Sequence, residues 1–223
     1  ALAIDFNLMP EETMAQTTHY FVESIHRRDN HLSVGFLGIS HLLPALTKCG
    51  QNELAFTLLE QKGNPGWLYS VINGATTIWE RWNSYIAETG TFGDVSMNSF
   101  NHYAYGSIGQ WLYRTVLGIQ TGEEKDEAGY HRIFLTPSWG GALSFAKGEQ
   151  ATPFGKITSS WEKKENSIVY HCTIPANTTA HLSLPSSCHS SVQILEGAAI
   201  ADTAVSGVAD FELVSGSYTF KIC

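Results

Sequence analysis

The chain has 223 residues, a length that suggests one large domain or two small ones. Its formal net charge is −8, and only 15% of its residues are charged. The sequence has no basic run or stripe, so nucleic acid and anionic membrane surfaces are poor candidates as partners. Hydrophobic residues make up 43% of the chain, enough for a sizeable core, but no stretch approaches the length of a transmembrane helix.

The first half of the chain has the periodicity of α-helices. Pro10, Glu11 and Glu12 mark a helix start, because proline suits the first turn and acids suit the positive end of the helix dipole. We expect Gly50 to end a later helix as its C-cap. Apolar residues recurring at helical spacing form four stripes: Met14, Phe21, Val22 and Ile25; Ile39, Leu42, Leu43 and Leu46; Leu54, Ala55, Leu58 and Leu59; Tyr105, Ile108, Leu112 and Val116.

The second half of the chain changes to the alternation of β-strands. Residues 119–129 are polar and are interpreted as a connection, with a domain boundary near residue 125. After it, apolar residues alternate with polar or smaller ones, as in Ile168, Tyr170, Cys172 and Ile174 and again in Tyr218, Phe220 and Ile222. The patterns predict an α+β multidomain protein: a helical domain over residues 1–125 and an antiparallel β-sandwich over residues 126–223.

The cysteines do not form a recognisable metal site. Cys49, Cys172, Cys188 and Cys223 contain no Cys-x-x-Cys pair, so a zinc site is not expected. A disulfide between Cys172 and Cys188 and free thiols are both open from the sequence. The glycines at positions 35 and 38 lack the lysine of a phosphate loop, and no serine lies in a nucleophile elbow. We therefore expect neither a metal nor another cofactor.

Residues 62–103 have little periodicity and hold the residues that are best suited to chemistry. An unstructured stretch of this length in a compact domain is usually functional. Within it, Glu80 lies between Trp79 and Trp82 in the sequence Trp-Glu-Arg-Trp. Flat indole rings are suited to stacking on sugars, and a carboxylate among them can act on a water or a hydroxyl. Glu80 is the best catalytic candidate; the alternative is a surface ion pair with Arg81.

A second block, residues 98–106, adds amide, imidazole and phenol groups. His102 can hydrogen-bond a sugar hydroxyl or orient a carboxylate. The alternative is a structural histidine that caps the following helix, a role that Asn101 can also fill. We predict that His102, Asn101, Trp79 and Trp82 bind substrate.

Taken together, the blocks resemble the bacterial α-L-rhamnosidases of glycoside hydrolase family 78. The resemblance is carried, in order and spacing, by residues 35–38, 42–46, 66–69, 74–82 and 97–106, and later by residues 148–161. It extends from residue 1 to the end of the chain. It implies an inverting exo-glycosidase that removes terminal α-L-rhamnosyl residues from glycosides or polysaccharides and that is built on an (α/α)6 barrel followed by a C-terminal β domain.

The resemblance also assigns roles. The glutamate of the Trp-Glu-Arg-Trp block is the general base in the family, which falls on Glu80, and the histidine of the second block contacts rhamnose or water, which falls on His102. The general acid belongs to an Asp-x-x-x-Arg-x-Glu type of segment that this sequence lacks. Four or five helices are also fewer than the twelve of the barrel. We therefore expect the C-terminal part of a partial barrel, inactive in isolation, that exposes helix faces such as those of Met14, Phe21 and Ile25.

Two other functions stay open at this point. One is a non-catalytic carbohydrate-binding module, and the other is an (α/α)6 glycosidase for another neutral or deoxy sugar. The expected partners are a rhamnose-containing glycoside or polysaccharide and the preceding N-terminal part of the same protein, with a homo-oligomer as a further alternative. The chain opens without Met and already in an apolar helical pattern, so we expect it to continue a longer protein, and its localisation stays open.

Overall fold

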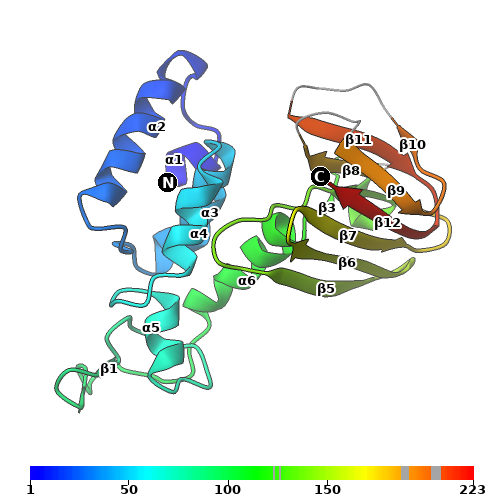
Figure 1. The fold of residues 1–223 in the computed structure, drawn as a ribbon. Coiled ribbons are helices and arrows are strands. Elements are labelled where there is room, and N and C mark those ends of the chain that lie inside the picture. Colours follow the sequence, from blue (N-terminus) through cyan, green and yellow to red (C-terminus); the bar gives the residue numbers. More distant parts are fainter. Residues whose placement is uncertain (123, 126, 187–190, 202–206) are drawn as a thin grey trace. The chain divides into compact units, whose positions relative to one another are not determined.

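The computed structural model describes the chain except for residues 123, 126, 187–190 and 202–206 (Figure 1). It contains two compact units. The helical unit consists of Ala1–Trp111 and Gly140–Ala142, and the β unit of Leu112–Trp139 and Leu143–Cys223. Helices followed by β-sheets is the order that the sequence predicts. Within the described part of the chain, no helix has the length and apolar character needed to cross a membrane.

The helical unit contains short to medium helices and one small hairpin. The helices are α1 (Leu2–Asp5), α2 (Glu11–His26), α3 (Phe36–Lys48), α4 (Asn52–Leu59), α5 (Trp67–Ile72), the 3₁₀ turn η1 (Ala104–Ser107) and α6 (Ile108–Trp111). The hairpin pairs β1 (Tyr85–Ile86) with β2 (Thr91–Phe92). Pro10 directly precedes α2 and Glu11 and Glu12 lie in its first turn, which confirms the predicted helix start.

Helix α3 is the centre of this unit. It packs against α1, α4, η1 and α6, and it buries the predicted stripe of Ile39, Leu42, Leu43 and Leu46. Gly50 ends it with a φ of 70°, a backbone conformation that glycine adopts without a Cβ clash. The Gln51 N–H donates to the Leu46 carbonyl at 2.8 Å, so the predicted C-cap is confirmed.

The fourth apolar stripe is helical but not one regular α-helix. The backbone passes from η1 through α6 into the π-helix η2 (Leu112–Val116), so the hydrogen-bond spacing changes along it. Gly106 and Gly109 lie at its start, and glycine is a poor α-helix former. Trp111 nevertheless buries its ring here and donates from Nε1 to Thr47 Oγ1 at 2.9 Å.

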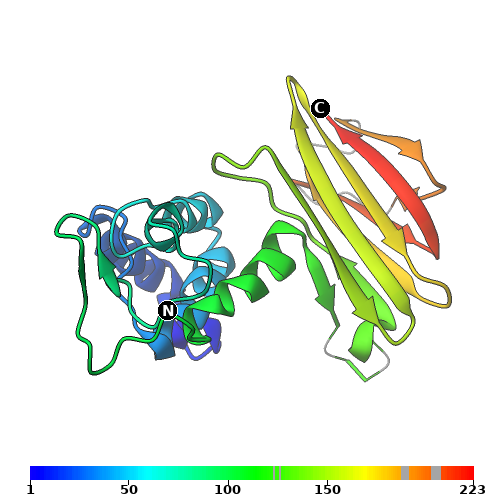
Figure 2. The same ribbon diagram turned by 90° about the horizontal axis from the view of Figure 1, so that it is seen from below.

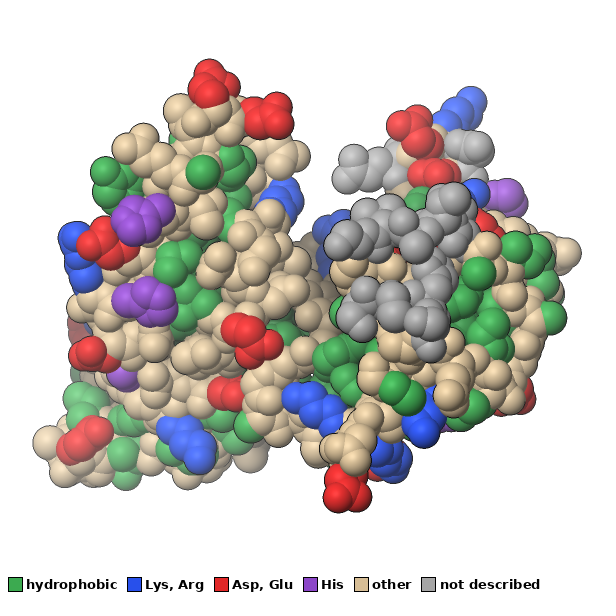
Figure 3. All heavy atoms as spheres, turned by 45° about the horizontal axis from the view of Figure 1, so that its top comes forward, with side chains coloured by type: hydrophobic (Ala, Val, Ile, Leu, Met, Phe, Trp, Pro, Cys, Tyr) green, Lys and Arg blue, Asp and Glu red, His purple; other side chains and the backbone are tan. Residues whose placement is uncertain are grey.

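The helical unit exposes many apolar side chains. Helix α2 buries only Ile25 among its sixteen residues. Met14 and Phe21 are half-buried, so they are partly exposed as predicted, whereas the prediction that Ile25 is exposed is wrong. Leu37 on α3 and Tyr103 before η1 are both 85% exposed. Apolar side chains also appear at several places on the surface of this unit in Figure 3. Exposed apolar patches of this kind drive association with a partner.

The β unit contains two five-stranded sheets. The first has the order β10-β11-β8-β4-β3 and the second β5-β6-β7-β12-β9, which Figure 2 shows from below. The strands are β3 (Ile119–Thr121), β4 (Arg132–Leu135), β5 (Phe145–Thr152), β6 (Gly155–Lys164), β7 (Ser167–Ile174), β8 (Thr179–Pro185), β9 (Val192–Glu196), β10 (Ile200–Ala201), β11 (Val208–Leu213) and β12 (Gly216–Ile222), with the 3₁₀ turn η3 (Ala128–Tyr130). All pairs are antiparallel except β4–β8, which is parallel, whereas the sequence predicts only antiparallel strands.

The core of the β unit lies between these sheets. Along β7, Tyr170, Cys172 and Ile174 are buried and Ile168 is half-buried, and along β12 the predicted Tyr218, Phe220 and Ile222 are buried. Phe220 meets Phe211 of the other sheet with ring centroids 5.0 Å apart. The segment predicted as a polar connection, residues 119–129, begins with strand β3, because Ile119 is buried and pairs with Leu135 of β4.

The cysteines that the structure describes are free thiols. Cys49 is half-exposed, Cys172 is buried and Cys223 is exposed. Burial raises the pKa of the Cys172 thiol to about 12, so this thiol stays protonated near neutral pH. Cys188, the other member of the disulfide considered from the sequence, lies outside the described residues.

The exposed apolar side chains of the helical unit generate a first prediction. We expect the 223-residue chain, purified alone, to self-associate at micromolar concentration, since Leu37, Val71 and Ile72 are all more than half exposed. Sedimentation velocity over a concentration series measures this. Leu37→Lys combined with Val71→Lys should shift the distribution toward monomer, while Ala15→Lys on exposed α2 is the matched control. A monodisperse monomer for the unchanged chain, with cooperative unfolding, would contradict the prediction.

Candidate active site

The two sequence blocks that carry the chemistry are joined by their backbones. The Glu80 N–H donates to the Ser99 carbonyl at 2.9 Å, and the His102 N–H donates to the Ile78 carbonyl at 2.8 Å. Neither segment belongs to a helix or sheet, so these bonds replace regular secondary structure for that stretch. They bring Glu80 close to the residues around His102, which lie about twenty positions away in the sequence. We call these two paired segments, residues 78–80 and 99–102, the ledge.

Glu80 is held by the backbone and not by a cation. Its Oε2 accepts the Ser99 N–H at 2.7 Å, and the side chain is half-exposed, so solvent water reaches the carboxylate. Arg81, the partner considered in the alternative interpretation, lies 3.8 Å from the Asp94 carboxylate instead. The carboxylate is therefore both fixed in position and in contact with solvent.

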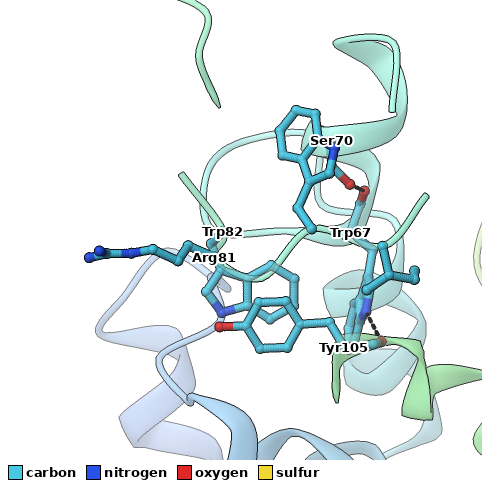
Figure 4. Close-up of a pocket in the computed structure, with 7 residues that line it drawn as sticks. Trp67, Ser70, Arg81, Trp82 and Tyr105 are labelled. Carbon is cyan, nitrogen blue, oxygen red and sulfur yellow. Dashed lines mark hydrogen bonds between the residues drawn. The ribbon is translucent and has the colours of Figure 1, made fainter. Parts of the chain in front are cut away.

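Three aromatic rings, those of Trp67, Trp82 and Tyr105, form a packed tier (Figure 4). Trp82 lies parallel to Tyr105, with centroids 3.7 Å apart and planes 6° apart, and its edge meets Trp67 at 5.5 Å. The Trp82 Nε1–H donates to the Val34 carbonyl at 3.0 Å, and the Trp67 Nε1–H donates to the Tyr105 carbonyl at 2.9 Å. One face of Trp82 is therefore already stacked, so a sugar can stack only on the other.

The Trp79 ring is buried and does not offer an open face for stacking. Its side chain is 6% exposed, and its ring meets Phe100 edge-to-face with centroids 5.4 Å apart. Phe100 comes from the second block, so this ring contact reinforces the backbone pairing at Glu80. Trp79 thereby helps to fix the position of the residue that follows it.

His102 has the position of a helix cap. Its Nδ1 accepts the Ala104 N–H at 3.3 Å at the start of η1, and its ring stacks on Phe36 of α3 at 4.7 Å. Because Nδ1 is an acceptor, the neutral imidazole carries its proton on Nε2, which is then a donor. Asn101 is exposed, and its backbone N–H donates to Ser99 Oγ at 3.1 Å, so the cap is supplied by His102.

The cavity beside the aromatic tier is small. A recess of about 10 Å³, enough for one water molecule, is lined by Trp67, Ser70, Ile78, Trp79, Arg81, Trp82 and Tyr105. Figure 4 shows Arg81 directed away from the stacked rings. A sugar ring does not fit in this recess.

Sequence reasoning missed three residues that build this ledge. Ser99 supplies the N–H that holds Glu80, Tyr105 stacks on Trp82, and Phe36 stacks on His102. The spacing of Tyr105 fits a helical stripe and does not indicate that its ring stacks on Trp82. The Ser99 contact uses a backbone group, so no residue type in the sequence could indicate it.

Comparison with known proteins shows the family of the chain. Residues 1–116 match the family described as the bacterial α-L-rhamnosidase 6-hairpin glycosidase domain, and residues 118–198 match the bacterial α-L-rhamnosidase C-terminal domain. A 6-hairpin glycosidase domain followed by a β domain is thus the class that the chain fits. The chain belongs to the bacterial α-L-rhamnosidase family.

Relatives in sequence and in structure support the assignment. The chain is 38% identical to an α-L-rhamnosidase of Streptomyces avermitilis, over 99% of this chain and 21% of the relative. It is 40% identical to an α-L-rhamnosidase of Formosa agariphila, over 86% of this chain and 20% of the relative. The crystal structure of the Streptomyces avermitilis enzyme complexed with L-rhamnose matches this chain with a TM-score of 0.91. The match covers all of this chain and 21% of that enzyme's chain. The crystal structure of the α-L-rhamnosidase from Aspergillus terreus matches with a TM-score of 0.85 at 29% sequence identity. That match covers 99% of this chain and 23% of the other chain. The chain spans about a fifth of the length of these relatives.

The Tyr105 phenol offers a test of the site's electrostatics. Its pKa is raised above the ordinary 10.0, chiefly because burial disfavours the phenolate; the Arg81 cation lowers it and the Glu80 carboxylate raises it. We expect Glu80→Gln to lower the Tyr105 pKa and Arg81→Gln to raise it, measured by NMR titration with Tyr105→Phe to assign the signal. The raised pKa stabilises the fold fully below pH 10, and this contribution is lost as pH rises through the folded-state pKa. If both variants moved the pKa in the same direction, the arrangement of the three groups would be wrong.

Proposed function

We propose that this chain is the C-terminal part of an inverting α-L-rhamnosidase that hydrolyses terminal α-L-rhamnosyl residues of glycosides or polysaccharides. The observation that carries the proposal is the half-exposed Glu80 carboxylate, held by the Ser99 N–H in a family whose Streptomyces avermitilis member was crystallised with L-rhamnose. In this proposal the helical unit is part of an (α/α)6 barrel and the two sheets form a C-terminal β-sandwich. The division predicted from the sequence, residues 1–125 and 126–223, stays a prediction.

In this mechanism Glu80 is the general base. Its carboxylate takes a proton from a water molecule while the water oxygen bonds to the anomeric carbon and the glycosidic bond breaks. The leaving oxygen receives a proton from a carboxylic acid outside this chain. Inverting glycosidases hold these two carboxyl groups about 6.5–9.5 Å apart, so that the water fits between the base and the sugar. The product then has the opposite anomeric configuration.

The neighbouring residues have supporting roles in the proposal. The Nε2–H of neutral His102 donates to a sugar hydroxyl or to the attacking water, while Nδ1 stays committed to the Ala104 N–H. Trp79 and Trp82 form the apolar wall, with one face of Trp82 stacked on Tyr105. Asn101 is exposed near the ledge, and its contact with substrate stays a prediction.

The rest of the protein completes the site. Because the relatives are about five times longer than this chain, we propose that a preceding part of the same protein covers the exposed apolar side chains of α2, α3 and α5 and supplies the general acid. A homo-oligomer is the other arrangement that would cover them.

The first test of this proposal uses the chain alone. We expect the purified 223-residue chain to hydrolyse an aryl α-L-rhamnoside no faster than its Glu80→Gln variant, because it holds one carboxylate of the two that inversion needs. Release of the aryl alcohol is measured by absorbance, with the complete protein as the positive control. Clear turnover by the chain, lost in Glu80→Gln, would place the second carboxylate within these residues.

The second test concerns the base in the complete protein. Glu80→Gln should lower kcat by about 10²–10⁴-fold with little change in KM, because a general base acts in the transition state. His102→Ala should act more on KM. Azide should restore activity to Glu80→Ala and give a glycosyl azide of inverted configuration, since the anion attacks without losing a proton. Near-normal kcat in Glu80→Gln would overturn the assignment and leave a non-catalytic carbohydrate-binding role.

A further inference from the structure

The helical unit contains a second hollow, separate from the small recess beside the aromatic tier. Its volume is about 310 Å³, which lies within the range of about 300–1,000 Å³ for small-molecule pockets. It lies between the turn that follows α5 and the β1–β2 hairpin. Its lining consists of Asn73, Gly74, Ala75, Thr76, Thr77, Trp79, Tyr85, Phe92 and Phe100.

One side of this hollow is a continuous row of aromatic rings. Phe100 meets Trp79 edge-to-face at 5.4 Å and Phe92 edge-to-face at 5.7 Å, and Phe92 meets Tyr85 at 5.8 Å between centroids. Phe92 is 63% exposed although it contacts the rings of both Tyr85 and Phe100. A phenylalanine held in place by its neighbours and open to solvent is suited to stacking on the apolar face of a ligand.

The other side of the hollow is polar and neutral. Thr76 and Thr77 are exposed; the Thr77 hydroxyl donates to the Phe100 carbonyl, which leaves its oxygen as an acceptor. Asn73 donates from Nδ2 to the Tyr69 carbonyl at 2.8 Å, which fixes its amide. None of the lining residues is charged. A hollow with aromatic faces on one side and uncharged hydroxyl and amide groups on the other fits a neutral sugar ring, which has an apolar C–H face and a rim of hydroxyls.

We propose that this hollow is a second carbohydrate subsite, which binds a neutral sugar ring of the substrate beyond the rhamnosyl residue that is cleaved. The proposal rests on the function proposed above. Trp79 lines both this hollow and the small recess beside the aromatic tier, and Glu80 directly follows Trp79 in the chain. Trp79 is thus the residue that the two spaces share, and in this proposal a branched or extended glycan occupies the hollow while its rhamnosyl end lies at Glu80.

The experiment compares two substrates in the complete protein that contains this chain. We expect Phe92→Ala to lower the ratio of kcat/KM for a rhamnose-terminated trisaccharide to kcat/KM for an aryl α-L-rhamnoside by about five- to tenfold, the size of one lost ring contact. Phe92→Tyr keeps the ring and should keep the ratio. Phe145→Ala on β5 removes a similarly exposed phenylalanine ring, 65% exposed, from the β unit and should not change the ratio.

A binding measurement separates this subsite from the catalytic proposal. The disaccharide that remains after rhamnose removal is titrated calorimetrically into Glu80→Gln protein, with and without Phe92→Ala. Binding that Phe92→Ala weakens supports the subsite even where Glu80 proves not to be the base. An unchanged ratio, an equal loss on both substrates, or a loss confined to the aryl rhamnoside would each overturn the proposal; the last would indicate a pocket for an aromatic aglycone.

Discussion

The candidate site depends on the backbone pairing of residues 78–80 with residues 99–102. Two N–H to carbonyl hydrogen bonds join these segments, and each is worth about 1 kcal/mol net. Their larger effect is positional, because they place the Glu80 carboxylate at the Ser99 N–H. The edge-to-face contact of Trp79 with Phe100 strengthens the same pairing. Without it, Glu80 would be one more acid on an irregular loop.

Indole N–H groups hold together parts of the chain that have little secondary structure. In the helical unit, Trp82 donates to the Val34 carbonyl and Trp67 to the Tyr105 carbonyl. In the β unit, Trp161 donates to the Val116 carbonyl at 2.8 Å. Each bond satisfies a carbonyl that no sheet or regular helix pairs, while the ring fills apolar space. Tryptophan therefore acts here mainly as a connector, which explains why so few of the six indoles are open to a sugar.

The helical unit leaves many apolar side chains exposed. Helix α2 buries one residue of sixteen, and large apolar side chains on α3 and α5 face solvent. The relatives are about five times longer than this chain. The β unit differs, because its two sheets cover one another's apolar faces through contacts such as that of Phe211 with Phe220. The two units thus differ in how much of their own core they supply.

The sequence by itself determined the order of helices and strands, the start of α2, the C-cap at Gly50 and the family, because each is written in local spacing or in motifs of adjacent residues. It also indicated Glu80 and His102 by residue type, although their roles remain proposals. Tertiary structure alone decided that Ser99 holds Glu80, that Tyr105 stacks on Trp82 and that β4 pairs in parallel with β8. These contacts join residues from distant positions or use backbone groups that every residue carries. Side-chain type and periodicity therefore carry no signal for them.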